Sequence, residues 1–382
     1  MRKRLRKCRD YFTITKIFLV IFFKKNCIFV ETSRGRGIRI HHYHLAAMKK
    51  STLADIARIT GLSITTISRV INGKSEEFRI SKASQDVVMK AIKDLDYSPN
   101  YAAQSLRSSS MHTIGLLVPR IDNPFFANIA SIVIQEAHKF TYPVMVIDTC
   151  ENPVEEDRAL DTLLQRNVDG IIMAPCSETP ERLREIAEQK PIVLIDRYFE
   201  DEDLPYVATD NYSGAFDATK LLIENGHRDI ICIQGAPLSV TSRNRVRGYR
   251  DAMKNAGLEA NIRIRGNEYS TQNGYIETKL ELLSGSPVTA VFALSSTILL
   301  GALRAIEEQG LKVPDDISII SFDNNIFLDY LNPPISRVCQ PLEHIGVLSV
   351  KLLMDSILGL EDRQPSVMLP PTLIRRGSVR HI

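Results

Sequence analysis

The sequence predicts an α/β protein in two parts: a three-helix head with a helix-turn-helix at residues 48–98, and a two-lobed, doubly wound body at residues 112–382. Three observations predict it. A helix-turn-helix pattern occupies residues 52–73, short apolar runs alternate with amphipathic stretches from Thr113 onward, and charge is unevenly divided along the chain. The 382 residues, 44% of them hydrophobic, suffice for two or three compact units.

The charge distribution separates the two parts. Residues 1–47 hold twelve basic and two acidic side chains, and residues 48–107 hold ten basic and six acidic ones. Because the whole chain has a net charge of only +3, the rest is acidic. A basic head on an acidic body suits a polyanionic partner that contacts one end of the protein.

Residues 1–47 are interpreted as a mis-annotated extension, with Met48 as the true start. Basic residues and the apolar run Ile14–Phe23 resemble a signal peptide, but the run is too short to span a bilayer and no small-residue cleavage site follows. The histidines at 41, 42 and 44 could bind a metal, but the interpretation without metal is preferred.

The six cysteines predict reduced thiols in a cytoplasmic protein. They are widely spaced, with no C-x-x-C pair and no short Cys/His ligand pattern, which argues against a zinc site or a disulfide framework. Cys150 and Cys176 flank predicted strand ends, where packing is preferred over a redox role. We predict no cofactor and no metal.

The head begins with a capped helix. Thr52 and Asp55 have the spacing of a capping box, and Gly61 permits a tight turn. Ser63 can cap a second helix, whose inward stripe is Ile67, Val70 and Ile71.

The outward face of that second helix carries Ile64, Thr65, Ser68 and Arg69, side chains suited to base edges in a DNA groove. Asn72 and Gly73 end the helix. From these residues alone, an ordinary helical hairpin remains an equal alternative.

A third helix is predicted at Lys82–Leu95, capped by Ser81. Its expected core stripe is Val87, Val88, Ala91, Ile92 and Leu95. The next segment, Asn100–Arg107, is too short and too weakly apolar to form a helix alone in water, so we expect a helix that forms conditionally. A plain linker is the alternative.

The body alternates predicted strands and helices, as a doubly wound parallel fold requires. The predicted strands are Ile114–Val118, Val144–Asp148, Ile171–Ala174, Ile192–Asp196, Ile230–Gln234, Ala290–Leu294 and Ile317–Phe322. The predicted helices are Phe125–Phe140, Glu155–Arg166, Asn211–Asn225, Asn244–Ala256, Thr297–Gln309 and Leu342–Leu358. A cleft between two such lobes is the expected ligand site.

Residues 52–73 strongly resemble the head of the lactose-repressor (LacI/GalR) family of regulators, as does the run Tyr97-Ser-Pro-Asn100. Seven body segments resemble the effector domain of that family in order, from Ile114-Gly-Leu-Leu-Val to Ser321-Phe-Asp-Asn324. The resemblance covers residues 50–378. It implies a body like the periplasmic sugar-binding proteins, with three crossings between lobes, which we place near Asp210, Val338 and Gly359.

The domain boundaries follow. We expect a helix-turn-helix domain at 48–98, a hinge helix and linker at 99–111, and an effector-binding domain at 112–382. Lobe one would hold about 112–210 and 339–359, and lobe two about 211–338 and 360–382.

The resemblance also implies functional residues. In the family the segment matching 100–107 folds on DNA, pairs with its dimer mate and inserts a leucine into the minor groove, which assigns that role to Leu106. The expected DNA-binding residues are Thr52, Ser63, Ile64, Thr65, Ser68, Arg69, Asn72, Asn100, Leu106 and Arg107.

The expected effector is a sugar, sugar acid or sugar phosphate, since paired hydroxyls suit carboxylates and guanidiniums, and sugar rings suit aromatic walls. The expected contacts are Phe125, Phe126, Asp196, Arg197, Arg245, Ser295 and Asp323. Many relatives have an Asn-Asp pair where this chain has Ser295 and Ser296. The lost carboxylate favours an anionic sugar, provided that Arg197 and Arg245 remain cationic.

These features predict a homodimeric DNA-binding regulator, expected to be a repressor, on a pseudo-palindromic operator. Because no leucine heptad follows Ser378, dimers are expected rather than tetramers. An enzyme is disfavoured, since no nucleotide-binding loop, nucleophile elbow or metal-ligand set occurs. An exported sugar-binding protein with residues 1–30 as its signal is the remaining alternative, but such a protein would have no use for a DNA-binding head.

Overall fold

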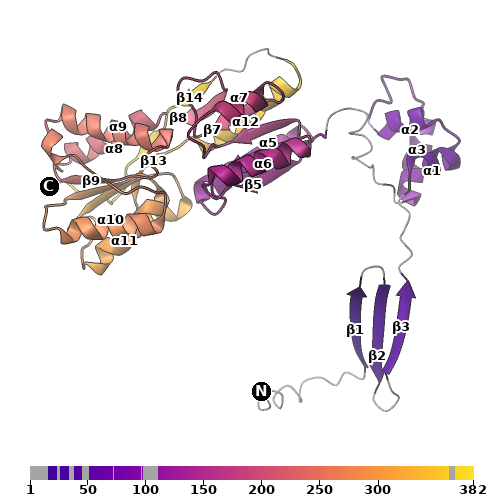
Figure 1. Ribbon diagram of the computed structural model, residues 1–382, viewed down its shortest axis with the longest axis horizontal. Helices are drawn as coiled ribbons and strands as arrows, with labels where there is room; N and C mark the ends of the chain where they lie inside the picture. The colour runs from indigo at the N-terminus through magenta and orange to yellow at the C-terminus, as the bar shows by residue number, and fades with distance from the viewer. Residues whose placement is uncertain are drawn as a thin grey trace. The chain divides into compact units, whose positions relative to one another are not determined.

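The computed structural model describes residues 16–23, 26–33, 38–44, 51–71, 73–95, 97, 111–360 and 366–382 (Figure 1). The chain divides into two compact units, Met1–Asn100 and Tyr101–Ile382, which are described separately below. Among the described residues, no helix combines the length and apolar character needed to cross a membrane.

The first unit begins with a three-stranded antiparallel sheet. It consists of β1 (Lys16–Phe23), β2 (Asn26–Ser33) and β3 (Ile38–His44), with β2 in the centre. The apolar run that resembles a signal peptide therefore lies largely in β1. Its branched and aromatic residues favour strands, a preference that the sequence analysis did not use.

Three helices follow in the head: α1 (Leu53–Thr60), α2 (Ile64–Ile71) and α3 (Lys82–Asp94). Thr52 and Asp55 form the predicted capping box, and Gly61 takes the left-handed conformation that ends α1. The Ser63 hydroxyl accepts from the Thr66 amide at 3.1 Å and so caps α2 as predicted. The buried core is small, and consists of Ile56, Ile67, Val70, Val88 and Ala91.

Val87 does not belong to this core. Its side chain is 48% exposed, so the prediction that it lies on the inward stripe of α3 was wrong. Val88 and Ala91 are three residues apart on one helix face, and Val87 is rotated by about 100° from Val88.

Lobe one of the second unit is a six-stranded sheet in the order β14-β8-β7-β6-β4-β5. The strands are β4 (Ile114–Val118), β5 (Val144–Asp148), β6 (Gly170–Met173), β7 (Ile192–Ile195), β8 (Tyr206–Thr209) and β14 (Val367–Leu369), all parallel in their pairings. Neighbouring residues of a strand point to opposite faces, so Leu116 and Leu117 enter different cores.

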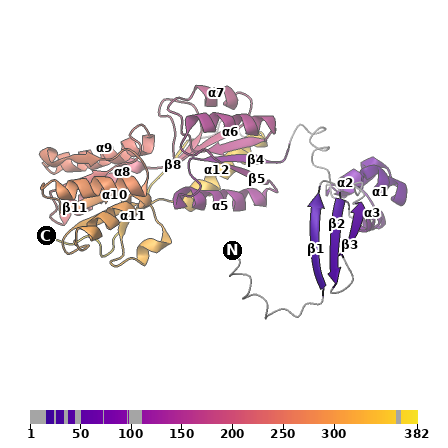
Figure 2. The ribbon, with the colours of Figure 1, turned by 60° about the horizontal axis from the view of Figure 1, so that its bottom comes forward.

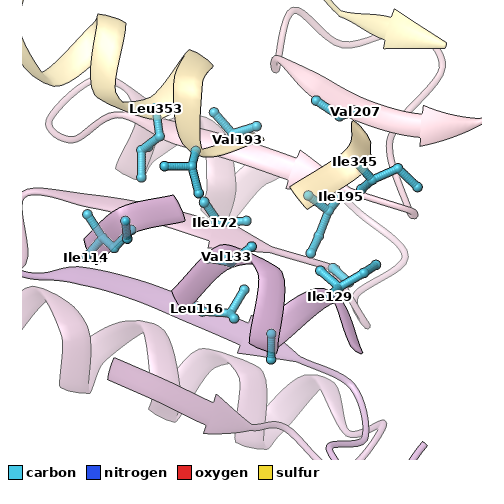
Figure 3. Close-up of a cluster of buried hydrophobic side chains, with 14 of the residues drawn as sticks. Ile114, Leu116, Ile129, Val133, Ile172, Val193, Ile195, Val207, Ile345 and Leu353 are labelled. Carbon is cyan, nitrogen blue, oxygen red and sulfur yellow. The ribbon is translucent and has the colours of Figure 1, made fainter. Parts of the chain in front are cut away.

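Helices cover both faces of this sheet. The helices α5 (Pro124–Lys139) and α12 (Leu342–Ile357) pack on one face, where Val133, Val193 and Leu353 meet (Figure 3). The other face is covered by α6 (Pro153–Gln165) and α7 (Glu181–Ala187), as Figure 2 shows.

Lobe two repeats this architecture, with the strand order β10-β9-β11-β12-β13-β15. Its strands are β9 (Ile230–Ile233), β10 (Arg263–Arg265), β11 (Ala290–Ala293), β12 (Ser318–Phe322), β13 (Ser336–Cys339) and the antiparallel β15 (Thr372–Ile374). One face carries α8 (Asn211–Glu224) and α9 (Val240–Asn255), and the other α10 (Thr271–Leu283) and α11 (Ser296–Glu308) (Figure 1). Two short 3-10 helices lie at Glu259–Asn261 and Ile326–Asp329.

The chain passes between the lobes three times. The first passage is at Asp210, between β8 and α8, and the second lies between β13 and α12, next to the predicted Val338. The third lies between β14 and β15, after Leu369, so its placement near Gly359 was wrong. After α12 the chain first adds β14 to lobe one beside β8, and a three-residue strand has too little pattern to be recognised in sequence.

Candidate functional site

The head presents its outward face along α2. Ser63, Ile64 and Thr65 are exposed, with Ile64 at 43%, while Ser68 and Arg69 are half-buried. The Arg69 guanidinium lies 3.7 Å from the centre of the Phe78 ring, a contact that sequence reasoning missed. Phe78 therefore holds the guanidinium at the end of this face.

Thr52 has a local role. Its hydroxyl donates to the Asp55 carboxylate at 2.8 Å and accepts from the Asp55 amide at 3.3 Å. The Thr52 hydroxyl, together with the Thr52 amide that donates to the same carboxylate at 3.0 Å, holds the pKa of Asp55 below its usual range. The other expected DNA contacts, namely Asn72, Asn100, Leu106 and Arg107, lie outside the described residues, as does the predicted hinge helix.

A cavity of about 30 Å³ lies between the two lobes of the second unit. It is lined by Asn123, Phe125, Phe126, Glu151, Asp196 and Arg197 of lobe one, by Thr241, Arg245, Tyr269, Ser295 and Asp323 of lobe two, and by Gln340 at the second crossing. Most of these residues follow the carboxyl end of a strand, where ligands of open α/β sheets bind. All seven expected effector residues line this one cavity.

Sequence reasoning missed five of the lining residues, namely Asn123, Glu151, Thr241, Tyr269 and Gln340. Glu151 follows the predicted strand Val144–Asp148 by three residues, so its place near the sheet edge could have been expected, but not the turn that directs its side chain into the cavity. Gln340 lies beside the predicted crossing at Val338. Tyr269 follows β10, a strand that the sequence analysis did not predict.

Two aspartates occupy equivalent places in the two lobes. Asp196 directly follows β7 and Asp323 directly follows β12, and both have the positive φ that side chains other than glycine rarely adopt. Asp323 is fully engaged: its Oδ2 accepts from the Ser296 amide at 2.9 Å, and its Oδ1 from the Gln340 side chain at 2.8 Å. Gln340 thereby joins the second crossing to the cavity.

Arg245 is buried in lobe two. Its Nε donates to the Asn211 side chain at 2.7 Å, its Nη1 donates to the Leu294 carbonyl at 2.6 Å, and the guanidinium lies 3.9 Å from the Phe322 ring centre. Ser295 caps α11, since its hydroxyl accepts from the Ile298 amide at 3.2 Å. Both residues therefore have structural contacts while they line the cavity.

Three buried polar atoms of the cavity have no hydrogen-bond partner. They are Asp196 Oδ1, Arg197 Nε and Gln340 Oε1, half of all such side-chain atoms among the described residues. A buried polar group without a partner costs about 1–3 kcal/mol. The cavity thus offers two acceptors and one donor, together with the apolar Phe125 and Phe126 rings, to a small polar molecule.

Burial also perturbs Asp196. Desolvation raises its pKa from 3.8 to about 6, against the attraction of Arg245 and Arg197. Because the folded-state pKa lies above the unfolded one, Asp196 contributes stability that is fully present below pH 3.8 and is lost as the pH rises to about 6.

Asp196→Asn should therefore flatten the pH dependence of stability across that window by up to about 3 kcal/mol. Urea unfolding at several pH values measures this slope, with the exposed Asp315→Asn as the control of equal charge. An unchanged slope in Asp196→Asn would contradict the assignment.

The described cysteines, 150, 176, 232 and 339, are unpaired thiols, and burial raises the pKa of Cys176 to about 12. Such a thiol is a poor nucleophile at neutral pH, so the packing interpretation is favoured for Cys176. Cys150 is exposed, so the packing interpretation was wrong for that residue. No cluster of three or more metal-ligating side chains occurs among the described residues.

Models of two families match the chain. The model described as "Bacterial regulatory proteins, lacI family" matches residues 52–100, and a "Periplasmic binding protein-like domain" matches residues 219–379. The ribose operon repressor of Haemophilus influenzae is 33% identical over 330 residues, which cover 86% of this chain and 98% of that protein. The repressor PurR of Histophilus somni is 33% identical with 86% and 99% coverage.

Solved structures of transcription regulators also match the chain. The lac repressor dimer bound to operator and the anti-inducer ONPF matches with a TM-score of 0.79 and 25% identity, over 87% of this chain and all of that one. A LacI family transcriptional regulator from Enterococcus faecium with bound ribose matches with a TM-score of 0.64 and 28% identity, over 71% and 99%.

Proposed function

This chain belongs to the lacI family of bacterial regulatory proteins, and we propose that it controls transcription through a small neutral sugar bound in the cavity between its lobes. It is a DNA-binding transcriptional regulator of the repressor type, and the exported-binding-protein alternative is excluded by its family. We propose further that it works in the cytoplasm and catalyses no reaction, as its relatives are transcription regulators.

One observation carries the choice of ligand: the unpartnered Asp196 Oδ1, Arg197 Nε and Gln340 Oε1 of one cavity. Hydroxyl groups can satisfy acceptors and donors alike, and the Phe125 and Phe126 rings can face the C–H surface of a sugar. Ribose is the first candidate, because one relative is a ribose operon repressor and another was solved with bound ribose.

The anionic sugars expected from Ser295 and Ser296 are disfavoured. That expectation required Arg197 and Arg245 to remain cationic, but the positive charge of Arg197 is paired, since both of its terminal nitrogens donate to Glu151. The cavity also holds three carboxylates, Glu151, Asp196 and Asp323, against the two guanidiniums. A neutral ligand avoids the repulsion that an anion would meet.

The test is binding of the full chain to DNA from its own upstream region, with and without D-ribose and a panel of other neutral sugars. A specific complex that one sugar abolishes identifies an inducer, and a complex that forms only with sugar identifies a corepressor. Either result supports the proposed function. The absence of any sugar effect on a specific complex would refute the proposed effector class.

The head is proposed to read the operator through Ser63, Ile64, Thr65, Ser68 and Arg69. Asn72, Asn100, Leu106 and Arg107 complete the proposed interface, with Leu106 as a minor-groove wedge. Ligand-induced movement of the lobes would change the spacing of the two hinges in a dimer, and so couple cavity and operator.

Arg69→Ala should weaken specific operator binding by about 1–3 kcal/mol if Arg69 contacts a base edge. Phe78→Leu removes only the supporting ring and should cost less. Filter-binding titrations on operator and random DNA measure both variants. An equal loss on both DNAs would instead identify a phosphate contact.

The protein works as a homodimer, as its structural relative does on operator. We propose α10 as part of the dimer interface, because Ile276, Leu280 and Leu283 form an exposed apolar stripe on one face of that helix. Leu300 of the neighbouring α11 is also exposed.

Leu280→Asp should therefore shift the protein toward monomers in sedimentation velocity and weaken operator binding at least about tenfold, since one head recognises only a half-site. Val154→Asp makes the same change at an exposed apolar residue of lobe one and should remain dimeric. A dimeric Leu280→Asp protein would exclude α10 from the interface.

A further inference from the structure

We propose that Glu151 sets the charge selectivity of the effector cavity, because its carboxylate pairs with Arg197 and offsets the positive charge that would otherwise attract an anionic ligand. This inference rests on the proposed function of the cavity. It assigns a role to a residue that neither the sequence analysis nor the proposed sugar contacts include. Three sets of observations support it.

The first is the geometry of the ion pair. Arg197 Nη1 donates to Glu151 Oε2 at 2.8 Å, and Nη2 donates to Oε1 at 2.6 Å, the two-point geometry in which guanidinium binds carboxylates and phosphates. Nη1 also faces the Pro175 carbonyl at 3.4 Å. The guanidinium has five N–H donors, and these three bonds leave the Nε–H and the second N–H of Nη2. A ligand at these donors meets a guanidinium whose charge is already paired with Glu151, which suits a hydroxyl better than an anion.

The second is the loop that holds Glu151. Cys150 and Glu151 both have positive φ, at 54° and 53°, two successive residues in a conformation that costs energy without glycine. The loop is fixed by its backbone: the Glu151 amide donates to the Pro119 carbonyl and the Cys150 amide to the Asp148 carboxylate, each at 2.8 Å. These bonds direct the carboxylate of Glu151 at Arg197, whose side chain is 9% exposed.

The third is the charge of the larger outer cleft that adjoins the inner cavity. Both are lined by Glu151, Arg197 and Tyr269. The other charged residues of that cleft are Glu178, Glu200, Asp201, Glu202 and Glu268 against Arg120 and Arg243. Arg120 pairs with Asp122 at 2.7 Å, and Arg243 lies 3.8 Å from Glu200. No cation among these lining residues is therefore free of a carboxylate.

These observations predict what removal of the Glu151 charge should do. In Glu151→Gln the amide keeps nearly the same shape, but Arg197 loses its paired carboxylate and the net charge of the cavity rises by one. Anions should then bind more tightly, while a neutral sugar should change little. The effect should be local, because charges of the outer cleft are exposed to solvent and screened by salt.

The experiment is calorimetric titration of the full-length protein with D-ribose, D-ribose 5-phosphate and inorganic phosphate. The matched control is Glu178→Gln, which removes an exposed carboxylate of the same cleft. We expect Glu151→Gln to bind phosphate and ribose 5-phosphate at least about tenfold more tightly than the wild type, the scale of one ion pair near a protein surface. Glu178→Gln should change less than about twofold.

The tighter binding of phosphate and ribose 5-phosphate should disappear in the double variant Glu151→Gln/Arg197→Gln. Glu151→Ala makes the same charge change and replaces Glu151→Gln if the amide variant does not fold. No gain for anions, or an equal gain in Glu178→Gln, would overturn the proposal. If the wild type responds to no neutral sugar, the proposed function fails separately, and the phosphate titrations still decide the role of Glu151.

Discussion

Replacing Ile67 with alanine should abolish specific operator binding, by more than about 100-fold, and leave sugar binding by the second unit unchanged. Ile67 is completely buried in the head core, which among the described residues has five buried side chains with partly buried ones packed against them. An isoleucine-to-alanine change in a core costs about 2–5 kcal/mol, which is most of the stability expected of a domain this small. The proposed recognition helix α2 would then unfold with its domain.

The matched control is Val87→Ala, because Val87 lies in the same domain but is exposed. It should change neither thermal stability nor operator binding. Differential scanning calorimetry should show loss of the head transition in Ile67→Ala only, while titration with the effector gives the wild-type affinity. A head that stays folded and binds operator in Ile67→Ala would contradict the core assignment.

The body could be predicted well where the pattern is strong. Buried parallel strands are continuous apolar runs, so Ile114–Val118 was predicted to the residue, as was the half-buried edge strand Val144–Asp148. The three-residue strands β10, β14 and β15 are too short for such a run, and β13, with the sequence Ser-Arg-Val-Cys, is too polar. The helices α7 and α10 were also missed, and α9 begins at Val240 instead of Asn244.

The cavity residues divide for a related reason. Asp196, Arg197 and Asp323 follow strands that the sequence shows clearly, so their place at the sheet edge could be predicted. Glu151 reaches the cavity only because two residues adopt a left-handed turn, which no local pattern indicates. The pairing of Arg197 with Glu151 could therefore not be predicted from the sequence. The expected preference for anionic sugars did not take this pairing into account.

Asp323→Asn should leave operator binding intact and make the protein nearly insensitive to its effector, with sugar affinity reduced by about 100-fold. The Oδ2 of Asp323 accepts from both the amide and the hydroxyl of Ser296, at 2.9 and 3.2 Å, and its Oδ1 accepts from Gln340 at 2.8 Å. An asparagine must place its NH₂ group against one of these donors. Toward Ser296 the NH₂ group faces the Ser296 amide N–H, and toward Gln340 it requires the Gln340 amide to turn, which replaces the Oε1 acceptor in the cavity by an NH₂ group, so either orientation alters the network.

The Asp323→Asn substitution should also affect the second crossing between the lobes. Gln340 directly follows β13 and precedes α12, so its bond to Asp323 links the ligand wall to the chain that passes between the lobes. Without a fixed Asp323, the sugar should bind the different arrangements of the two lobes with more similar affinities. A ligand shifts operator binding only if these affinities differ, so the response to sugar should be lost.

Sugar titration and operator binding must therefore be measured on the same preparations. Asp315→Asn, which removes an exposed carboxylate of lobe two, should behave as the wild type in both. Wild-type effector response in Asp323→Asn would remove Asp323 from the effector site. Loss of operator binding without sugar would show that the substitution acts on the fold, because most of the proposed DNA contacts, those from Ser63 to Asn100, belong to the other unit of the chain.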